Sequence, residues 1–223
     1  MRLKWYGHAS FRVTADDGTA IVTDPYTPET SGYKPVNEIA DIVAVSTTTD
    51  SYHCRADLIP GNPEVVDTVA LAKKGEARTV RGIPFSAVSS LEALAHRDGN
   101  PEDNALYRFI VDGISIGHMG DVGNPLDETQ TAFFRGVDIL LALTGGYPTI
   151  ALDDLMTAID VIQPKLIVPM HFRTLRCTLY DILWLPSFLD YFDKTGVAFA
   201  HDCEVEITPG VLDSSRVLVL DYM

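Results

Sequence analysis

The sequence predicts an α/β protein whose strands form layered sheets. Strands and hairpins come first along the chain, helices then alternate with strands, and further strands follow. Hydrophobic residues make up 46% of the 223 residues, which is ample for a substantial core. Because no linker, low-complexity segment or close internal repeat divides the chain, we expect residues 1–223 to form a single compact domain.

The first part of the chain is predicted to consist mainly of strands and turns. Leu3–Val13 and Ala20–Asp24 are two strand-like runs, joined by the turn-like sequence at residues 16–18. Thr27–Asn37 is rich in proline, glycine and polar residues, which is typical of a surface loop. Further β signals lie at Ile42–Val45, Glu64–Val66 and Thr79–Ser86, with a short helix expected between the last two.

The second part alternates between the two kinds of element. Asp112-Gly113 stands between the apolar runs Tyr107–Val111 and Ile114–Gly117, which favours a β-hairpin. Apolar residues recur close to the helical period in Thr149–Ile162 and predict a helix. The apolar pattern also predicts a helix at Leu126–Arg135, strands at Val137–Leu143, Leu166–Met170, Val197–Ile207 and Val217–Leu220, and a helix or broken helix at Leu179–Phe192.

Charge and composition exclude several classes of function. The net charge of −14 and the pI of about 4.6 argue against a broad nucleic-acid-binding face. No run of about 18 apolar residues is present, so we expect no membrane span. The N-terminus lacks the pattern of a secretory signal, which favours a cytoplasmic location. The three cysteines are widely spaced without a CxxC pair, so a disulfide framework or a structural zinc cluster is weakly supported.

Polar residues that could take part in catalysis or metal binding follow several predicted strands. Ile42–Val45 ends in a burst of hydroxyl groups followed by Asp50, Tyr52 and His53. Asp24 follows another strand, and Leu166–Met170 ends at His171. A further cluster, GHMGD, ends at Asp121. Strand ends of this kind can converge on one edge of a sheet, where they suit a metal site or an acid–base site.

Motifs spread through most of the chain resemble the metallo-β-lactamase fold, in its small cytoplasmic branch that includes ascorbate-6-phosphate lactonase. The resemblance is carried, in the family's order, by WYGHASFRV (5–13), TDPY (23–26), ADIVAVS (40–46), GNPEVVD (61–67), GHMGDVG (117–123) and GGYPTIALDDLMTAIDVIQPKLIVPMHF (145–172). It implies a four-layer αββα sandwich with a metal site at one edge, between the two sheets. It also implies hydrolase ancestry.

The same resemblance implies that most metal ligands are replaced. The family signature His-x-His-x-Asp-His would fall on Thr47, Thr49, Ser51 and Tyr52, none of which matches in type. Neutral hydroxyl groups cannot replace imidazole and carboxylate ligands, so we expect the conventional dizinc centre to be lost. The family's middle histidine falls on Glu92. Asp121 falls on the metal-bridging aspartate and His171 on the final histidine, and both match in type.

Two hypotheses follow for the function. In the first, Asp121, His171 and Glu92 hold a single zinc, manganese or iron ion, assisted by His53 or Asp50, and a water bound to it hydrolyses a small lactone, ester or phosphoester. In the second, the site holds no metal. The protein then either binds a small molecule or acts as a scaffold without catalysis, or it runs metal-independent acid–base chemistry on Asp50, His53 or His171.

The remaining expectations concern the pocket and the partners. Thr47, Thr49, Ser51, Tyr52 and Asp24 are expected to line the pocket. The resemblance suggests that Asp24, which would orient metal-binding histidines, bonds to Thr47 or Thr49 instead. It places His8 near the site as a structural residue rather than a ligand. A small-molecule ligand or substrate is expected, with no nucleic-acid or membrane partner. The apolar side chains of Leu179–Phe192 suit either a homo-oligomer interface or a core helix.

Overall fold

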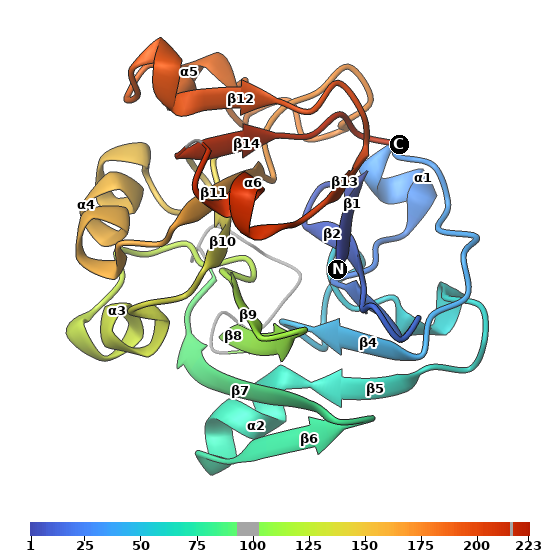
Figure 1. The fold of residues 1–223 in the computed structure, drawn as a ribbon. Helices are drawn as coiled ribbons and strands as arrows, with labels where there is room; N and C mark the ends of the chain where they lie inside the picture. The colour runs from blue at the N-terminus through green and yellow to red at the C-terminus, as the bar shows by residue number, and fades with distance from the viewer. Residues whose placement is uncertain (93–102, 215) are drawn as a thin grey trace.

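The computed structural model describes residues 1–92, 103–214 and 216–223, which form two facing β-sheets with helices on the outside (Figure 1). The six-stranded sheet has the order β13-β1-β2-β3-β4-β5, and the eight-stranded sheet has the order β12-β14-β11-β10-β9-β8-β7-β6. The αββα architecture expected from the sequence is therefore confirmed. Among the described residues, no helix has the length and apolarity needed to cross a bilayer.

The strands of the six-stranded sheet are β1 (Arg2–Gly7), β2 (Ser10–Thr14), β3 (Ala20–Thr23), β4 (Ile42–Val45), β5 (Glu64–Asp67) and β13 (Glu204–Glu206). Those of the eight-stranded sheet are β6 (Ala77–Val80), β7 (Ile83–Ser90), β8 (Asn104–Val111), β9 (Ile114–His118), β10 (Ile139–Leu143), β11 (Leu166–Met170), β12 (Val197–Phe199) and β14 (Val217–Val219). The helices are α1 (Pro28–Ser31), α2 (Thr68–Lys74), α3 (Glu128–Phe134), α4 (Leu152–Ile162), α5 (Pro186–Leu189) and α6 (Pro209–Leu212), with 3-10 turns at Ala56–Leu58 and Lys194–Gly196.

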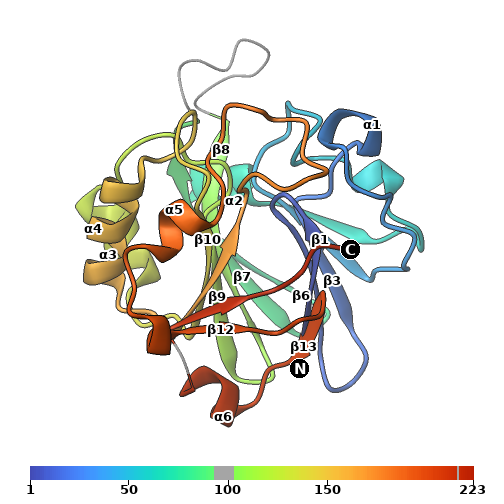
Figure 2. The ribbon, with the colours of Figure 1, turned by 90° about the horizontal axis from the view of Figure 1, so that it is seen from above.

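The outer helices cover the two sheets from opposite sides. Figure 2 shows α3, α4 and α5 along one side of the molecule and α1 on the other, with the sheets between them. Helix α4 buries Leu155, Ala158 and Ile159 on one face, which confirms the helical period seen in the sequence. The main apolar core runs between the sheets and includes side chains of both, such as Phe11 and Phe109.

Parallel pairing brings strand ends together. In the six-stranded sheet β3 is parallel to β4, and in the eight-stranded sheet β9, β10 and β11 are parallel to one another. The carboxyl ends of parallel neighbours lie at the same edge of a sheet. The segments that follow β3, β4, β9 and β11 can therefore contribute side chains to one place.

Several sequence predictions need correction. The run Leu3–Val13 is two antiparallel strands, because the backbone turns at Gly7 and His8, with φ of 124° and 53°. The Tyr33 ring also packs so closely on Gly7 that a Cβ there would clash with it.

Two further runs are each divided into two strands. Thr79–Ser86 covers parts of β6 and β7, and Val197–Ile207 covers β12 and β13, which lie in different sheets. Within Leu179–Phe192, where a helix or broken helix is expected, the helix is the single turn α5 (Pro186–Leu189). The loop Thr27–Asn37 contains the short helix α1.

Candidate metal centre

Three buried histidines from three different segments meet between the sheets. His8 lies in the turn between β1 and β2, His53 in the loop after β4, and His171 directly after β11. The ring of His8 lies 4.0 Å from that of His171 and 4.9 Å from that of His53, measured between centroids. One potential ligand atom from each histidine lies within 4.8 Å of those of the other two. This spacing is compatible with three imidazoles around one ion.

Asp121 adds a carboxylate to this cluster. Its Oδ1 atom lies 3.2 Å from His171 Nε2 and 3.7 Å from His53 Nε2. All three side chains are almost fully buried. An ionised carboxylate has no hydrogen to donate, so each ring must offer an N–H group or share a metal ion with it. His53 already uses its Nδ1 for Asp24, so its Nε2 faces Asp121 favourably only with a second proton or a metal ion.

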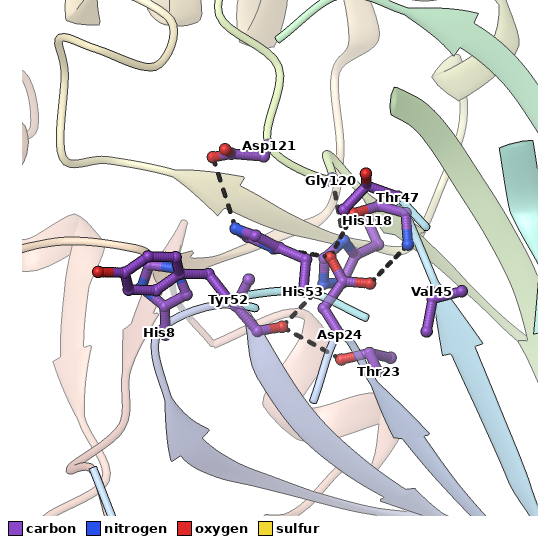
Figure 3. Close-up of polar contacts among 12 residues, drawn as sticks. His8, Thr23, Asp24, Val45, Thr47, Tyr52, His53, His118, Gly120 and Asp121 are labelled. Atoms are coloured by element: carbon purple, nitrogen blue, oxygen red, sulfur yellow. Dashed lines mark hydrogen bonds and ion pairs between the residues drawn. The ribbon is translucent and has the colours of Figure 1, made fainter. Parts of the chain in front are cut away.

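Asp24 fixes the orientation of His53 from the other side (Figure 3). Its Oδ2 atom lies 3.1 Å from His53 Nδ1, and its carboxylate also accepts hydrogen bonds from Ser46 N, Ser46 Oγ and Tyr107 Oη. Burial alone would raise the pKa of Asp24, but His118, His53 and Ser46 outweigh it and lower the pKa. Because the carboxylate is ionised, His53 donates through Nδ1 and directs Nε2 at Asp121.

The surrounding charges favour a cation at His53. Burial lowers the pKa of His53, but the carboxylates of Asp121, Asp50 and Asp24 raise it to about 10. The His8 ring behaves in the opposite way, because burial and the neighbouring imidazoles of His171 and His53 hold its pKa well below the usual value. His8 is therefore neutral, the form in which imidazole binds metals.

The backbone of the cluster carries strain. His8, Asp24 and His171 have φ values of 53°, 38° and 54°, a region that residues other than glycine seldom occupy. The carbonyl oxygen of His8 accepts hydrogen bonds from His171 N and from Trp5 Nε1, each 3.0 Å long. The bond from Trp5 closes the strained turn onto its own strand β1, and the bond from His171 holds this turn against the strand end of the other sheet. Strain of this kind gathers at functional sites because it places side chains where an unstrained backbone cannot.

His118 lies beside the cluster but both of its ring nitrogens are used by the backbone. Its Nδ1 accepts from Gly120 N at 3.0 Å, and its Nε2 lies 2.9 Å from the carbonyl oxygen of Ala9 (Figure 3). Its pKa is lowered, chiefly by burial, which agrees with a neutral ring that donates through Nε2. His118 therefore links the end of β9 to the β1–β2 turn through hydrogen bonds and is not free to bind a metal.

The residues that replace the family's histidine motif lie around the same loop. Thr47 is buried and its hydroxyl is 3.3 Å from that of Thr49, which is exposed. The Tyr52 ring lies 5.3 Å from the His8 ring, and Figure 3 shows the two side by side. Ser51 is partly buried and its carbonyl oxygen accepts a hydrogen bond from Thr27 N.

Two predicted site carboxylates have other contacts. Asp50 accepts hydrogen bonds from the backbone N–H groups of Tyr52 and His53, and burial raises its pKa. Glu92 is buried, and its charge adds to the rise in the pKa of Asp50. The roles of Asp50 in acid–base chemistry and of Glu92 as a ligand stay predictions.

The structure corrects one expectation about this site. Asp24 bonds to Ser46, His53 and Tyr107, whereas the sequence suggested Thr47 or Thr49 as its partners. His8, expected near the site as a structural residue, contributes its ring to the histidine cluster, and its role there stays a prediction. The signal that could have found it is the sequence Gly7-His8, since a glycine before a polar residue can end a strand in a tight turn.

The donor set fits a metal ion. The Nε2 atom of His8 is buried and, among the described residues, has no hydrogen-bond partner. Burying a polar atom without a partner costs free energy, which a bound metal ion or water molecule would offset. Three imidazoles and one carboxylate are ligands that zinc and iron(II) accept in proteins. Threonine, serine and tyrosine stand where the resemblance places the first motif, and the loss of the conventional two-metal arrangement stays a prediction.

Comparisons with known proteins place this chain in a family. The family model for the β-lactamase superfamily domain matches residues 2–171. The chain belongs to the metallo-β-lactamase superfamily. Among its relatives is a UPF0173 metal-dependent hydrolase of Methanoculleus marisnigri, 30% identical, with 78% of this chain and 82% of the relative covered. A second UPF0173 metal-dependent hydrolase, from Carboxydothermus hydrogenoformans, is 27% identical, with 89% of this chain and 95% of the relative covered.

Solved structures agree with this assignment. A crystal structure from Thermotoga maritima, described as a Zn-dependent hydrolase of the metallo-β-lactamase superfamily, has 27% identity and a TM-score of 0.77, and covers 100% of this chain and 99% of its own. A metal-dependent hydrolase from Parabacteroides distasonis has a TM-score of 0.67 at 16% identity, covering 99% and 93%, and shows the fold alone.

Proposed function

We propose that this protein is a single-metal hydrolase whose ion is held by His8, His53 and His171, with the carboxylate of Asp121. The observation that carries the proposal is the convergence of three buried imidazoles and one carboxylate from four segments of the chain. The names of the relatives, which describe metal-dependent hydrolases, support the same class of activity.

The substrate class follows from what such an ion supplies. A divalent metal bound there would polarise a carbonyl or phosphoryl oxygen and make a water molecule more acidic, which suits the cleavage of an ester, lactone or phosphoester. In ester hydrolysis the water oxygen bonds to the acyl carbon while the bond from that carbon to the alcohol oxygen breaks. The proton of the water goes to the departing alcohol, so that an acid and an alcohol are released.

The protein's own residues prepare the site for this reaction. Asp24 accepts from Nδ1 of His53 and so keeps its Nε2 available toward Asp121. Asp50 holds the backbone of residues 52 and 53 and thereby fixes where the His53 side chain begins. The bond from His171 N to the carbonyl oxygen of His8 ties two ligands from opposite sheets together, which limits their movement.

Metal reconstitution tests the proposal. The purified protein is stripped with a chelator, dialysed against zinc, manganese or iron(II), and its metal content measured. We expect one ion per chain, and loss of stoichiometric binding in His53→Ala and His171→Ala. His8→Gln, which keeps a polar side chain but removes the imidazole, is expected to bind at least tenfold more weakly. His201→Ala is the matched control, because His201 is exposed and stacks on Phe199.

Activity is measured on the same samples with p-nitrophenyl acetate, a γ-lactone and bis-p-nitrophenyl phosphate. We expect hydrolysis of at least one substrate that a chelator abolishes and the metal restores. A folded protein that takes up none of the three metals and hydrolyses none of the three substrates would overturn the proposal. That result would favour the metal-free binding or scaffold function considered from the sequence.

A further inference from the structure

A group of exposed apolar side chains lies on two adjacent segments, the loop that follows His171 and the segment that follows β10. We call it the apolar shelf and define it as Tyr147, Tyr180, Leu183 and Trp184. These side chains are 69%, 69%, 41% and 44% exposed. Large apolar side chains that gather on a surface in this way mark a binding surface more often than single exposed ones do.

Contacts through Arg173 hold one part of the shelf together. Its guanidinium carbon lies 5.4 Å from the centre of the Tyr180 ring and 5.1 Å from that of Trp184. Its Nη1 atom donates to the carbonyl oxygen of Tyr180, and its backbone N–H donates to that of Leu183. The arginine therefore serves as a support for the two rings.

The other part of the shelf packs against the segment that follows β10. Leu183 N donates to the carbonyl oxygen of Gly145 at 2.7 Å. The Leu183 side chain lies so close to Gly146 that a Cβ on this glycine would come within 2.9 Å of Leu183 Cδ1. Tyr147 follows Gly146 directly in the chain and is 69% exposed.

The backbone that carries the shelf lies next to the backbone of His171. Arg173 is two residues from His171, which limits the distance between their Cα atoms to about 7 Å. Gly145, whose carbonyl oxygen accepts from Leu183 N, also lies against the carbonyl oxygen of His171, since a Cβ on this glycine would come within 2.1 Å of that atom. The shelf and the residue that contributes the His171 ring are therefore joined through adjacent backbone.

From this continuity we infer that the apolar shelf receives the apolar arm of a carboxylic ester or lactone whose bond is cleaved at the metal centre. The inference rests on the proposed function and narrows its substrate class. A second copy of this chain fits the shelf less well for two reasons. Four side chains are far fewer than the 20–30 residues per partner of a standard interface. Two copies also repel each other, because each carries a net charge of −14.

Chain-length preference tests the inference in the metal-loaded protein. We expect kcat/KM for p-nitrophenyl hexanoate to exceed that for the acetate about tenfold, because four additional methylene groups are partly removed from water. Trp184→Ala and Tyr180→Ala should lose this preference through a higher KM for the hexanoate, with the acetate unchanged. Phe199→Ala is the matched control, since Phe199 is 52% exposed on β12. A preference that survives both shelf variants would overturn the inference.

A binding measurement separates this inference from the proposed function. The chain has two tryptophans, of which Trp5 is 1% exposed and Trp184 is 44% exposed. Iodide quenching of fluorescence excited at 295 nm therefore reports on Trp184. In the metal-free protein, where no hydrolysis can occur, hexanamide should protect Trp184 from iodide and acetamide should not.

The outcomes are distinct. Protection by hexanamide without any hydrolase activity would leave the shelf as an apolar binding site and refute the proposed function. Hydrolysis with neither chain-length preference nor protection would refute the shelf and leave the proposed function standing. A concentration-dependent dimer that Trp184→Ala abolishes, seen by size-exclusion chromatography, would assign the shelf to self-association and overturn the inference. Preference for mono-p-nitrophenyl adipate over the hexanoate would also overturn it, because its arm ends in a carboxylate.

Discussion

Asp24→Asn is the perturbation that probes the candidate metal centre most directly. The substitution keeps the size of the side chain but replaces Oδ2 or Oδ1 with an NH₂ group. In the native protein Oδ1 accepts from Ser46 N and Tyr107 Oη, and Oδ2 accepts from Ser46 Oγ and His53 Nδ1. An asparagine can keep the first pair through its oxygen. Its nitrogen then faces His53 Nδ1, so two donors meet.

The conflict changes His53. To relieve it, His53 must give up the proton on Nδ1 and hold its remaining proton on Nε2, which fixes an N–H group toward Asp121 where a metal would bind. Removing the partner of a buried charged hydrogen bond costs about 3 kcal/mol of the free energy of unfolding. Losing the residue that orients a metal-binding histidine lowers metal affinity by about 10- to 100-fold.

Two measurements check this prediction. Urea unfolding of the metal-free protein gives the change in the free energy of unfolding, and competition with a chromogenic zinc chelator gives the change in affinity. Ser46→Ala is the control, because it removes one hydrogen bond to Asp24 at a cost of about 1 kcal/mol and leaves the His53 tautomer alone. If Asp24→Asn binds zinc as tightly as Ser46→Ala, His53 is not a ligand oriented by Asp24 and the reasoning is refuted.

The remaining predictions concern stability. Lys165 binds Asp138 at 2.8 Å and lowers its pKa against the opposing effect of burial. A lowered folded-state pKa stabilises the protein above the unfolded value of about 3.9 and the effect disappears as pH falls through the folded pKa. Asp138→Asn should therefore lower the free energy of unfolding by about 1 kcal/mol at pH 7. Measured by urea unfolding, the difference between the native protein and this variant should shrink below pH 4, and an equal difference at pH 3 would contradict this. Gly120→Ala should destabilise by about 2 kcal/mol, because Gly120 has φ of 59° and a Cβ would come within 2.7 Å of Ala105 O; unchanged urea unfolding would refute that contact. Chelation should lower the Tm of the metal-loaded protein, with no such shift in His171→Ala; a shift of equal size in both would mean that the stabilising ion binds elsewhere.

The sequence was most informative where its signals are local. The apolar runs that predict β4, β10 and β11, and the Asp112-Gly113 turn between β8 and β9, depend on residues close together in the chain. The family motifs likewise identified the fold, because they occur in order along most of the chain. The segment Leu179–Phe192 was harder, since some of its apolar residues, such as Ile182 and Phe188, are buried whereas Tyr180 and Trp184 are exposed, without a helical period.

The membership of the site could be foreseen only in part. Asp121 and His171 were predicted at strand ends, and the structure brings them within 3.2 Å of each other. His53 was a candidate without a partner, and its pairing with Asp24 joins residues 29 positions apart. His8 could not be assigned from its spacing, because its ring reaches the cluster only through a left-handed turn clamped by Trp5 and His171.

The sequence by itself determined the sandwich of two sheets, and it predicts the loss of the family's leading ligand motif and the retention of Asp121 and His171. Only the tertiary structure decided that His8 and His53 join them, and that the apolar shelf lies on backbone adjacent to that of His171. The reason is physical. Strand formation depends on neighbours in the chain, whereas a metal centre depends on distances between segments that meet only when the two sheets pack together.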